Sequence, residues 1–329
     1  MHIAALALLV FLTSIPTSTA FLKRGLVVQK LKTRSLECET RPVPPSAKLP
    51  AANPFTYQNT SIQPKWEYLN GIPWYNNDAY QQHNSRLHSY LSMSAYGNYK
   101  HDCPKTFTTG FEILQEFNTS IGQSGYAALI PQMKNIVLVF KGYGEYQLLD
   151  WDTASIEDIV DNCKGCEAAQ GIKSLYISAK EATKDWDVVR KEVAKSKLRV
   201  SVTGHGIGGA VSALAALDLG SKKLVTHSYN QGMPRALNLA SVSRYDSLFQ
   251  GLASQSLSTE NDFMVKSIPK GTFFHVGTKV KIFGENQKEL INCFGNNENK
   301  TCIGNGKNIT NHKTYFTEIA TCGDAMDTN

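Results

Sequence analysis

The segment with the clearest chemical potential is a glycine-rich turn, Gly204-His205-Gly206-Ile207-Gly208-Gly209-Ala210. An apolar alternating run (198–203) precedes it and a mostly apolar run (209–219) follows, so we expect a strand, a sharp turn and a helix. Small residues suit such a turn because its backbone adopts a strained, positive-φ conformation. The first N–H groups of the helix then face the turn and can stabilise negative charge. This is the pattern of a G-x-S-x-G nucleophile elbow, except that Gly206 occupies the central position.

The surrounding chain supplies helices and strands that could hold this turn at a sheet edge. Helical spacing of apolar residues is found over 79–96 and 172–195. Strand-like runs occupy 125–130 and 135–140, joined by a turn at Pro131-Gln132, and recur at 224–229, 263–265 and 279–283. This alternation predicts an α/β fold with a largely parallel central sheet and flanking helices.

The N-terminus carries the features of a secretory leader. Residues 3–12 form a ten-residue apolar run, too short to span a bilayer, and Ser18-Thr19-Ala20 supplies a small-x-small cleavage pattern. We therefore expect a signal peptide at 1–20 and a secreted protein without a transmembrane segment; the alternative is a buried N-terminal helix. Residues 21–54 are proline-rich towards their end and fit a pro-segment or linker, which leaves 55–329 as the folded domain.

Charge distribution argues against a nucleic-acid-binding protein. The 329 residues carry a formal net charge of +6, with 42% hydrophobic and 19% charged residues. Residues 1–48 account for +5 of that charge, so the remainder is nearly neutral. A folded domain without a basic excess lacks the electrostatic footprint that phosphate backbones require. The composition also excludes a disordered or fibrous chain.

Seven cysteines in a secreted chain indicate disulfides. Cys163-Lys164-Gly165-Cys166 could be a redox pair, half of a zinc site or a small structural bridge. The structural bridge is favoured because the chain has no second CxxC. Cys293 and Cys302 could close a short loop, and the remaining three cysteines leave one unpaired. Four sequons predict glycosylation, at Asn59, Asn118, Asn299 and Asn308.

Six short motifs occur in order along the chain. They are Val139-Phe140-Lys141-Gly142-Tyr143, the glycine-rich turn at 204–210, Asn230-Gln231-Gly232-Met233-Pro234-Arg235-Ala236-Leu237-Asn238, Asn261-Asp262-Phe263-Met264-Val265-Lys266-Ser267-Ile268-Pro269, His275-Val276-Gly277 and His312-Lys313-Thr314-Tyr315-Phe316. Together they make the chain resemble the fungal (class 3) lipase-like family of α/β-hydrolases. The resemblance covers roughly 79–322 and implies an α/β-hydrolase fold.

The resemblance also implies which residues once formed the catalytic site. It points to Asp262 and His312 as acid and base, with Gly206 at the nucleophile position. In that chemistry the histidine takes the nucleophile's proton and the aspartate orients the imidazole. Tyr143 and Ile207 would supply the N–H groups of the oxyanion hole. Tyr143 departs from the family, which usually has a small hydroxyl residue there.

Other assignments follow from the same resemblance. Structural roles at the elbow or in bracing loops fall to His205, Arg235 and His275. The implied disulfides are Cys163–Cys166, Cys293–Cys302 and Cys103–Cys322, which leaves Cys38 unpaired. The lid of the family falls at 144–155. There Leu148, Leu149 and Trp151 could form an apolar face that binds lipid, or could pack on the core.

Gly206 decides the functional prediction, because a residue without a side chain cannot attack a carbonyl. In another serine hydrolase, loss of the nucleophile lowered turnover by about 10⁶. Other hydroxyls are poorly placed to substitute: Ser201 and Thr203 lie on the preceding strand, and Ser155 and Ser267 lie outside the catalytic motif positions. A water molecule held by His312 could still hydrolyse activated esters slowly.

Three hypotheses follow. The first is a secreted lipase-like pseudoenzyme of lipid metabolism that binds acyl lipid or a partner protein through the old pocket. The second is an active triacylglycerol or carboxylic ester hydrolase with a non-standard nucleophile. The third is a secreted interaction protein. The expected ligand is a lipid or ester-containing small molecule, alone or at a lipid–water interface. No metal, nucleotide or haem motif occurs, so we expect no cofactor.

Overall fold

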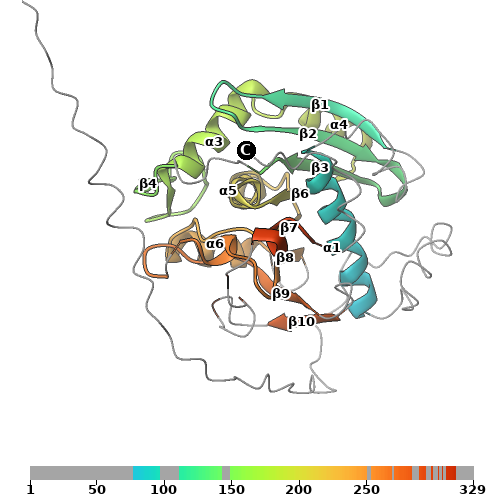
Figure 1. Cartoon of the computed structure of the whole chain (residues 1–329). Coiled ribbons are helices and arrows are strands. Elements are labelled where there is room, and N and C mark those ends of the chain that lie inside the picture. Colours follow the sequence, from blue (N-terminus) through green and yellow to red (C-terminus); the bar gives the residue numbers. More distant parts are fainter. Residues whose placement is uncertain are drawn as a thin grey trace, which may run out of the picture. The chain divides into compact units, whose positions relative to one another are not determined.

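The computed structural model describes residues 77–96, 111–142, 149–249, 253–268, 270–283 and 289–293, single residues at 298, 303 and 306, and 309–315 (Figure 1). All of them fall in the second of the two units into which the chain divides, Lys48–Asn329. The predicted signal peptide and proline-rich segment therefore lie outside the described residues. So do Tyr143, Leu148 and four of the seven cysteines.

Eight strands of the described chain form one sheet in the order β1-β2-β3-β6-β7-β8-β9-β10. Their bounds are β1 (Glu112–Asn118), β2 (Ser124–Ile130), β3 (Asn135–Phe140), β6 (Arg199–His205), β7 (His227–Gln231), β8 (Ser254–Thr259), β9 (Thr278–Phe283) and β10 (Glu289–Cys293). The five strands from β3 to β9 pair in parallel, and antiparallel strands complete both edges. The predicted α/β fold with a largely parallel sheet is confirmed.

Helices cover both faces of this sheet. In Figure 1, α3 (Gln170–Ala182), α5 (Ile207–Ser221) and α6 (Leu239–Leu248) lie on one side and α1 (Asn77–Ser94) lies on the other. The other described helical elements are η3 (Pro131–Met133), α4 (Asp187–Ser196), η6 (Met264–Lys266) and α8 (Ile309–His312). No helix in the described ranges is long and apolar enough to cross a membrane.

Strand β3 shows why the sequence folds into this layered arrangement. Its six residues are all buried, as expected for a parallel strand covered on both faces. Ile136, Leu138 and Phe140 join the core that contains α3 and α5. Val137 and Val139 alternate with them and pack with α1 in a second cluster. The two-residue period of the strand therefore supplies an apolar surface to each layer.

The helical pattern at 172–195 is interrupted in the structure. Helix α3 ends at Ala182 and α4 begins at Asp187, because Lys184, Asp185 and Trp186 all adopt left-handed φ values of 52°, 55° and 61°. Trp186 is fully buried against Phe117 and Phe140, with ring centroids 5.5 and 5.7 Å away. Seating this large side chain under the sheet requires the chain to turn, which helical periodicity alone does not indicate.

Two predicted strands also need correction. Residues 263–265 are not a strand, since Met264 to Lys266 form a 3₁₀ turn whose first N–H donates to the Asp262 carboxylate over 2.8 Å. The run predicted at 224–229 is extended only from His227, because the backbone N–H of Leu224 bonds back to Leu219 at the end of α5. In both places a local hydrogen bond replaces strand pairing.

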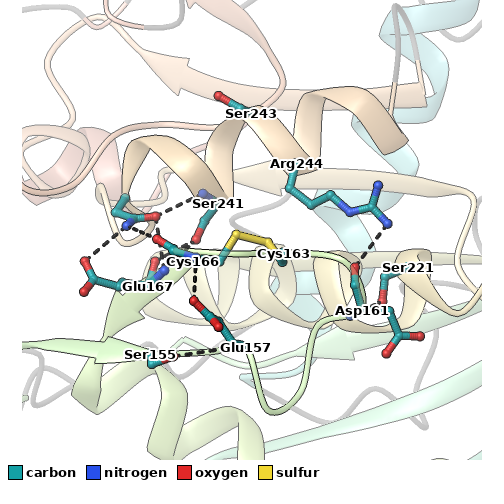
Figure 2. The surroundings of a disulfide bond; sticks show 12 residues. Ser155, Glu157, Asp161, Cys163, Cys166, Glu167, Ser221, Ser241, Ser243 and Arg244 are labelled. Carbon is teal, nitrogen blue, oxygen red and sulfur yellow. Dashed lines mark hydrogen bonds between the residues drawn. A yellow bond between two sulfur atoms is a disulfide. The ribbon is translucent and has the colours of Figure 1, made fainter.

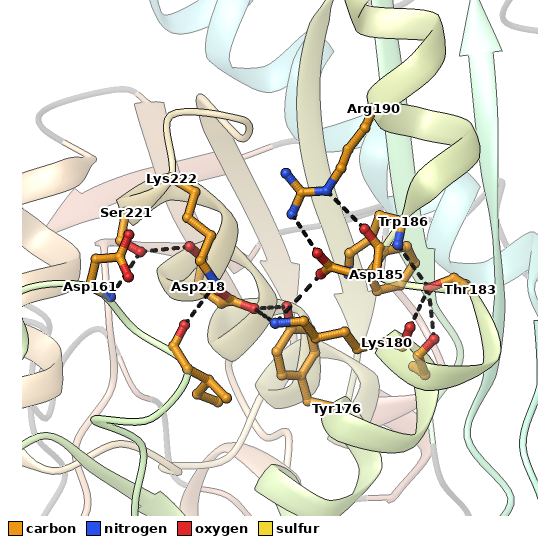
Figure 3. Close-up of polar contacts among 12 residues, drawn as sticks. Asp161, Tyr176, Lys180, Thr183, Asp185, Trp186, Arg190, Asp218, Ser221 and Lys222 are labelled. Atoms are coloured by element: carbon orange, nitrogen blue, oxygen red, sulfur yellow. Dashed lines mark hydrogen bonds and ion pairs between the residues drawn. The ribbon is translucent and has the colours of Figure 1, made fainter.

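A buried carboxylate ties α3 to α5 (Figure 3). Asp218 is fully buried and accepts hydrogen bonds from the Tyr176 hydroxyl (2.5 Å) and the Lys180 ammonium (2.9 Å). Lys222, one turn further along α5, pairs with the same carboxylate and donates to the Ile159 carbonyl over 3.1 Å. The charge is thus paired and hydrogen-bonded, the condition under which a buried carboxylate is tolerated.

The predicted bridge between Cys163 and Cys166 is present and closes a four-residue loop (Figure 2). The loop leads into β5 (Glu167–Ala169), which pairs with β4 (Thr153–Ser155). Leu149 and Trp151, from the predicted lid, are partly buried against the main core. Of the two alternatives for this segment, its described part packs on the core. Cys293 ends β10, but its predicted partner Cys302 and the predicted pair Cys103–Cys322 lie outside the described residues.

Candidate active site

The glycine-rich turn joins β6 to α5 as predicted. Gly206 adopts φ 58° and ψ −126°, a conformation that residues with side chains rarely adopt. Its N–H donates to the carbonyl of Gln231 on β7 over 2.8 Å, and its carbonyl accepts from the N–H of Gly209 over 3.0 Å. The turn is therefore fixed both to the neighbouring strand and to the first turn of α5.

Asp262 and His312 meet beside this turn. His312 Nδ1 lies 3.0 Å from both carboxylate oxygens of Asp262. The carboxylate also accepts from the Tyr315 hydroxyl over 2.5 Å and from the Met264 N–H over 2.8 Å. The side chain of Asp262 is fully buried, whereas that of His312 remains 12% exposed. Asp262 follows β8 and His312 ends α8, so the fold joins residues fifty positions apart.

The surroundings of Asp262 favour its ionised form. Burial alone would raise its pKa, but the His312 charge and the hydrogen bonds from His312 and Tyr315 lower it below the usual range. Tyr315 responds in the opposite direction: burial and the Asp262 charge raise its pKa. Tyr315 thus keeps its proton and donates it to a carboxylate that orients His312.

The other imidazole nitrogen faces Gly206. A Cβ atom built on Gly206 would lie 2.9 Å from His312 Nε2 and 3.2 Å from Cε1. The nitrogen that would accept a nucleophile's proton therefore points at a position occupied only by hydrogen. The Asp–His pair is assembled, and the hydroxyl that would complete a triad is absent from the turn.

Gly232, just after β7, permits this convergence. Its φ is 59°, and a Cβ atom there would lie 2.6 Å from Asp262 Oδ2, 2.9 Å from the Tyr315 hydroxyl and 3.0 Å from His312 Nδ1. A side chain at this position would have to push at least one of these three groups aside, in addition to straining the positive-φ backbone. The sequence motif contained Gly232 without indicating this role; the signal was a glycine directly after a parallel strand.

Part of this chain matches a known protein family. Residues 137–271 match the family model described as Lipase (class 3). Over this part of its length the chain is similar to class 3 lipases. The predicted resemblance is confirmed, while the meaning of Gly206 at the nucleophile position remains an inference from the geometry of the turn.

Curated relatives of this lipase-like protein include the secreted mono- and diacylglycerol lipase A of Penicillium cyclopium, 29% identical over 155 residues. That match covers 43% of this chain and 47% of the relative, so the chain spans about half the length of the curated relatives it matches. A Rhizopus niveus lipase is 31% identical over 120 residues, covering 35% of this chain and 28% of the relative.

Solved structures show the same fold. Lipase II from Rhizopus niveus superposes with a TM-score of 0.63 at 22% identity, covering 73% of this chain and 95% of that one. A lipase from Rhizopus microsporus var. chinensis gives a TM-score of 0.63 at 22% identity, covering 72% and 88%. At this level of identity the likeness concerns the α/β-hydrolase fold alone.

The predicted oxyanion residues are described only in part. Ile207 is buried and is the first residue of α5, whose leading N–H groups lack acceptors within the helix. Its N–H thus belongs to the helix end beside Gly206. Tyr143 lies outside the described residues, so its contribution stays a prediction.

The alternative hydroxyls of the lipase-like chain are engaged elsewhere. Ser201 is buried on β6, where its Oγ contacts His88 Nε2 (2.9 Å) and accepts from Asn135 (2.8 Å). Thr203, also buried, donates to the Tyr229 carbonyl over 2.6 Å. The remaining two behave similarly: Ser155 Oγ accepts from Glu157 N, and Ser267 Oγ donates to the Met264 carbonyl.

Arg235 and His275 brace a loop, as the sequence suggested. Both bind Glu298, a residue that sequence reasoning did not single out: Arg235 Nη2 lies 2.8 Å and His275 Nδ1 3.0 Å from its carboxylate. Fully buried Lys279 lies nearby and donates to Ser256 over 3.1 Å. Burial lowers the pKa of Lys279 to about 7, although the Glu298 and Asp262 charges oppose that shift.

Within the described ranges, no three His, Cys, Asp or Glu side chains are grouped so as to hold a metal ion.

Proposed function

We propose that this chain is a secreted lipase-like protein of lipid metabolism that is catalytically impaired and binds acyl lipid through the retained site. The observation that carries the proposal is the pairing of an assembled Asp262–His312 dyad with Gly206, which presents no nucleophile to it. Without an alcohol oxygen at the turn, an acyl-enzyme ester cannot form there.

Binding an acyl ligand needs no nucleophile, whereas turnover through an acyl-enzyme does. The end of α5 beside Gly206 offers backbone N–H donors, which suit the carbonyl or carboxylate oxygen of an acyl group. The name of the Penicillium relative, a secreted mono- and diacylglycerol lipase, supports acylglycerols as the first ligands to try. It also supports an extracellular location.

Two measurements on the purified full chain test this proposal. A fluorophosphonate probe should leave the protein unlabelled, because the probe requires an activated serine. A fluorescent fatty acid should bind saturably, and unlabelled monoacylglycerol should displace it. Labelling at a serine would contradict the impairment, and absence of saturable binding would contradict the lipid role.

A second candidate function is slow ester hydrolysis with water as the nucleophile. It is favoured by His312, whose Nδ1 is held by Asp262 while Nε2 faces the empty turn. The water oxygen would attack the ester carbonyl and His312 would accept its proton. The ester C–O bond would then break, and the departing alkoxide would take that proton from His312. Turnover of a short-chain ester that His312→Ala abolishes and Ser267→Ala leaves intact would establish this activity.

A secreted chain can also be N-glycosylated at its sequons, and this modification is simple to measure. Asn118 ends β1 at an exposed hairpin turn, and Ser120, the third residue of its sequon, is exposed as well. We expect Asn118 to be glycosylated when a eukaryotic secretory host produces the chain. Peptide mass spectrometry after glycosidase treatment should detect the modified asparagine, and Ser120→Ala should remove it. The sequons at 59, 299 and 308 lie outside the described residues and keep the same prediction.

A further inference from the structure

Helix α1, together with Tyr96 in the turn that follows it, is joined to strand β6 by a regular series of polar pairs. The three pairs are His88–Ser201 (2.9 Å), Ser92–Thr203 (2.8 Å) and Tyr96–His205 (2.8 Å). Partners advance four residues along the helical segment and two along the strand. From His88 to Ser92, four helical residues rise about 6.0 Å while two strand residues rise about 6.6 Å, so the two spacings match. Tyr96 continues the series from the turn after α1, where its N–H donates to the Met93 carbonyl over 3.0 Å. The last pair of this series lies at the glycine-rich turn.

Tyr96 contacts two parts of the site through one oxygen. Its hydroxyl donates to His205 Nδ1 and accepts from the backbone N–H of Gly142, at the end of the β3 segment. Burial raises the pKa of Tyr96, so the phenol keeps the proton that it donates. A Cβ atom on Gly142 would lie only 1.7 Å from the hydroxyl, which explains why the chain has glycine there.

Two contacts fix the protonation of His205. The main-chain carbonyl of His312 lies 2.7 Å from Nε2 and can only accept, so the neutral ring carries its proton on Nε2 and donates it there. Nδ1 is then unprotonated and accepts from the Tyr96 hydroxyl. Burial and the nearby His312 charge lower the pKa of His205 to about 3, so the ring stays neutral at physiological pH. The two imidazoles stack with centroids 4.2 Å apart.

We propose that Tyr96 is a positioning residue that, through His205, fixes the backbone of His312 against the glycine-rich turn. One phenol hydroxyl thereby joins the end of β3, the turn after β6 and the segment 309–315. That segment carries both His312 and Tyr315, the two side chains that bind Asp262. The positioning acts on geometry and does not depend on whether the site hydrolyses esters.

Tyr96→Phe tests the proposal in the full chain, because it removes one hydroxyl and retains the ring. Ser92→Ala is the matched control, since Ser92 lies one helical turn earlier in the series and contacts Thr203 instead of His205. Two readouts are needed: ¹⁵N resonances of the His205 ring, which report the protonated nitrogen, and amide hydrogen exchange across 312–315, which reports how firmly the segment is held.

The native His205 ring should carry its proton on Nε2 alone. Tyr96→Phe should populate the Nδ1-protonated ring and speed amide exchange at 312–315 by about tenfold, the effect of one lost hydrogen bond. Ser92→Ala should leave both readouts at native values while lowering overall stability. The proposal is overturned if native His205 is protonated on Nδ1, if Tyr96→Phe leaves exchange unchanged, or if both variants speed it equally.

Discussion

His312 Nε2 lies 2.9 Å from the position that a Cβ atom would occupy on Gly206. The imidazole is therefore seated where the first side-chain atom of a nucleophile would begin. The far end of a side chain can move by a few tenths of an ångström more easily than backbone can. We infer that the turn can accept a small side chain if His312 shifts slightly.

Gly206→Ala measures how strongly the turn depends on glycine. A methyl group at φ 58° strains the backbone and pushes His312 away. We expect the free energy of unfolding to fall by about 1–3 kcal/mol, the usual cost of a residue held in a sparsely populated backbone conformation. Urea denaturation checks this value. An unchanged midpoint would mean that the turn has a different conformation.

Gly232→Ala should be more damaging, because its methyl group would meet Asp262, His312 and Tyr315 at once. Gly165→Ala is the control, since Gly165 also has positive φ (71°) but a Cβ atom there meets nothing within 4 Å. Both variants place a side chain at positive φ, so the backbone strain is common to them and cancels in the comparison. We expect a loss of about 1 kcal/mol for Gly165→Ala and at least about 2 kcal/mol more for Gly232→Ala. Equal losses would show that the three side chains do not converge on Gly232.

Asp218→Ala removes the buried acceptor shared by α3 and α5. Tyr176 would lose the acceptor of its buried hydroxyl, and the partly exposed Lys180 and Lys222 would lose their shared ion-pair partner. We expect a loss of about 2–3 kcal/mol, the upper range for a buried polar group left without its partner. Asp187→Ala breaks an exposed pair with Lys191 and should lower stability by less than about 1 kcal/mol. Thermal and urea denaturation of both variants compare them; similar losses would contradict a buried hub.

Lys279 predicts a specific pH dependence of stability. Its folded pKa of about 7 lies below the value of about 10.4 for an unfolded lysine. Between these values the unfolded chain binds more protons, so this residue makes stability rise as the pH increases from about 7 to about 10. Below pH 7 the burial penalty is present in full.

Lys279→Met should therefore stabilise the protein at pH 7, and its advantage should shrink as the pH approaches 10. The slope of the difference is at most about 1.4 kcal/mol per pH unit. Urea denaturation at several pH values gives this difference directly, with effects common to both proteins removed. A difference that stays constant from pH 7 to 10 would place the titration of Lys279 outside this range.

Sequence patterns predicted best the elements whose apolar residues repeat strongly. Strand β3 (Asn135–Phe140) and helix α5 (Ile207–Ser221) occupy the regions expected from their hydrophobic runs. Strand β8 (Ser254–Thr259) was not predicted, because four of its six residues are serine or threonine. All six residues are nevertheless buried. Its burial follows from its central place in the sheet, which a local pattern does not contain.

In the candidate site, too, some features were predicted from the sequence and others became apparent only in the structure. Motifs identified Asp262 and His312, and the structure brings them together. The contacts of Tyr96 and Tyr315 with this site required the fold, because the motifs indicated neither hydrogen bond. A tyrosine suits a core packing position as well as a donor position, so its type alone does not separate the two.

Intact-mass analysis after fluorophosphonate treatment shows whether the turn at Gly206 provides a nucleophile. The native chain should keep its mass, while Gly206→Ser, treated in parallel, should gain one phosphonyl group at residue 206. A covalent adduct on the native chain, at whichever residue, would show that the protein retains an activated nucleophile and is not impaired.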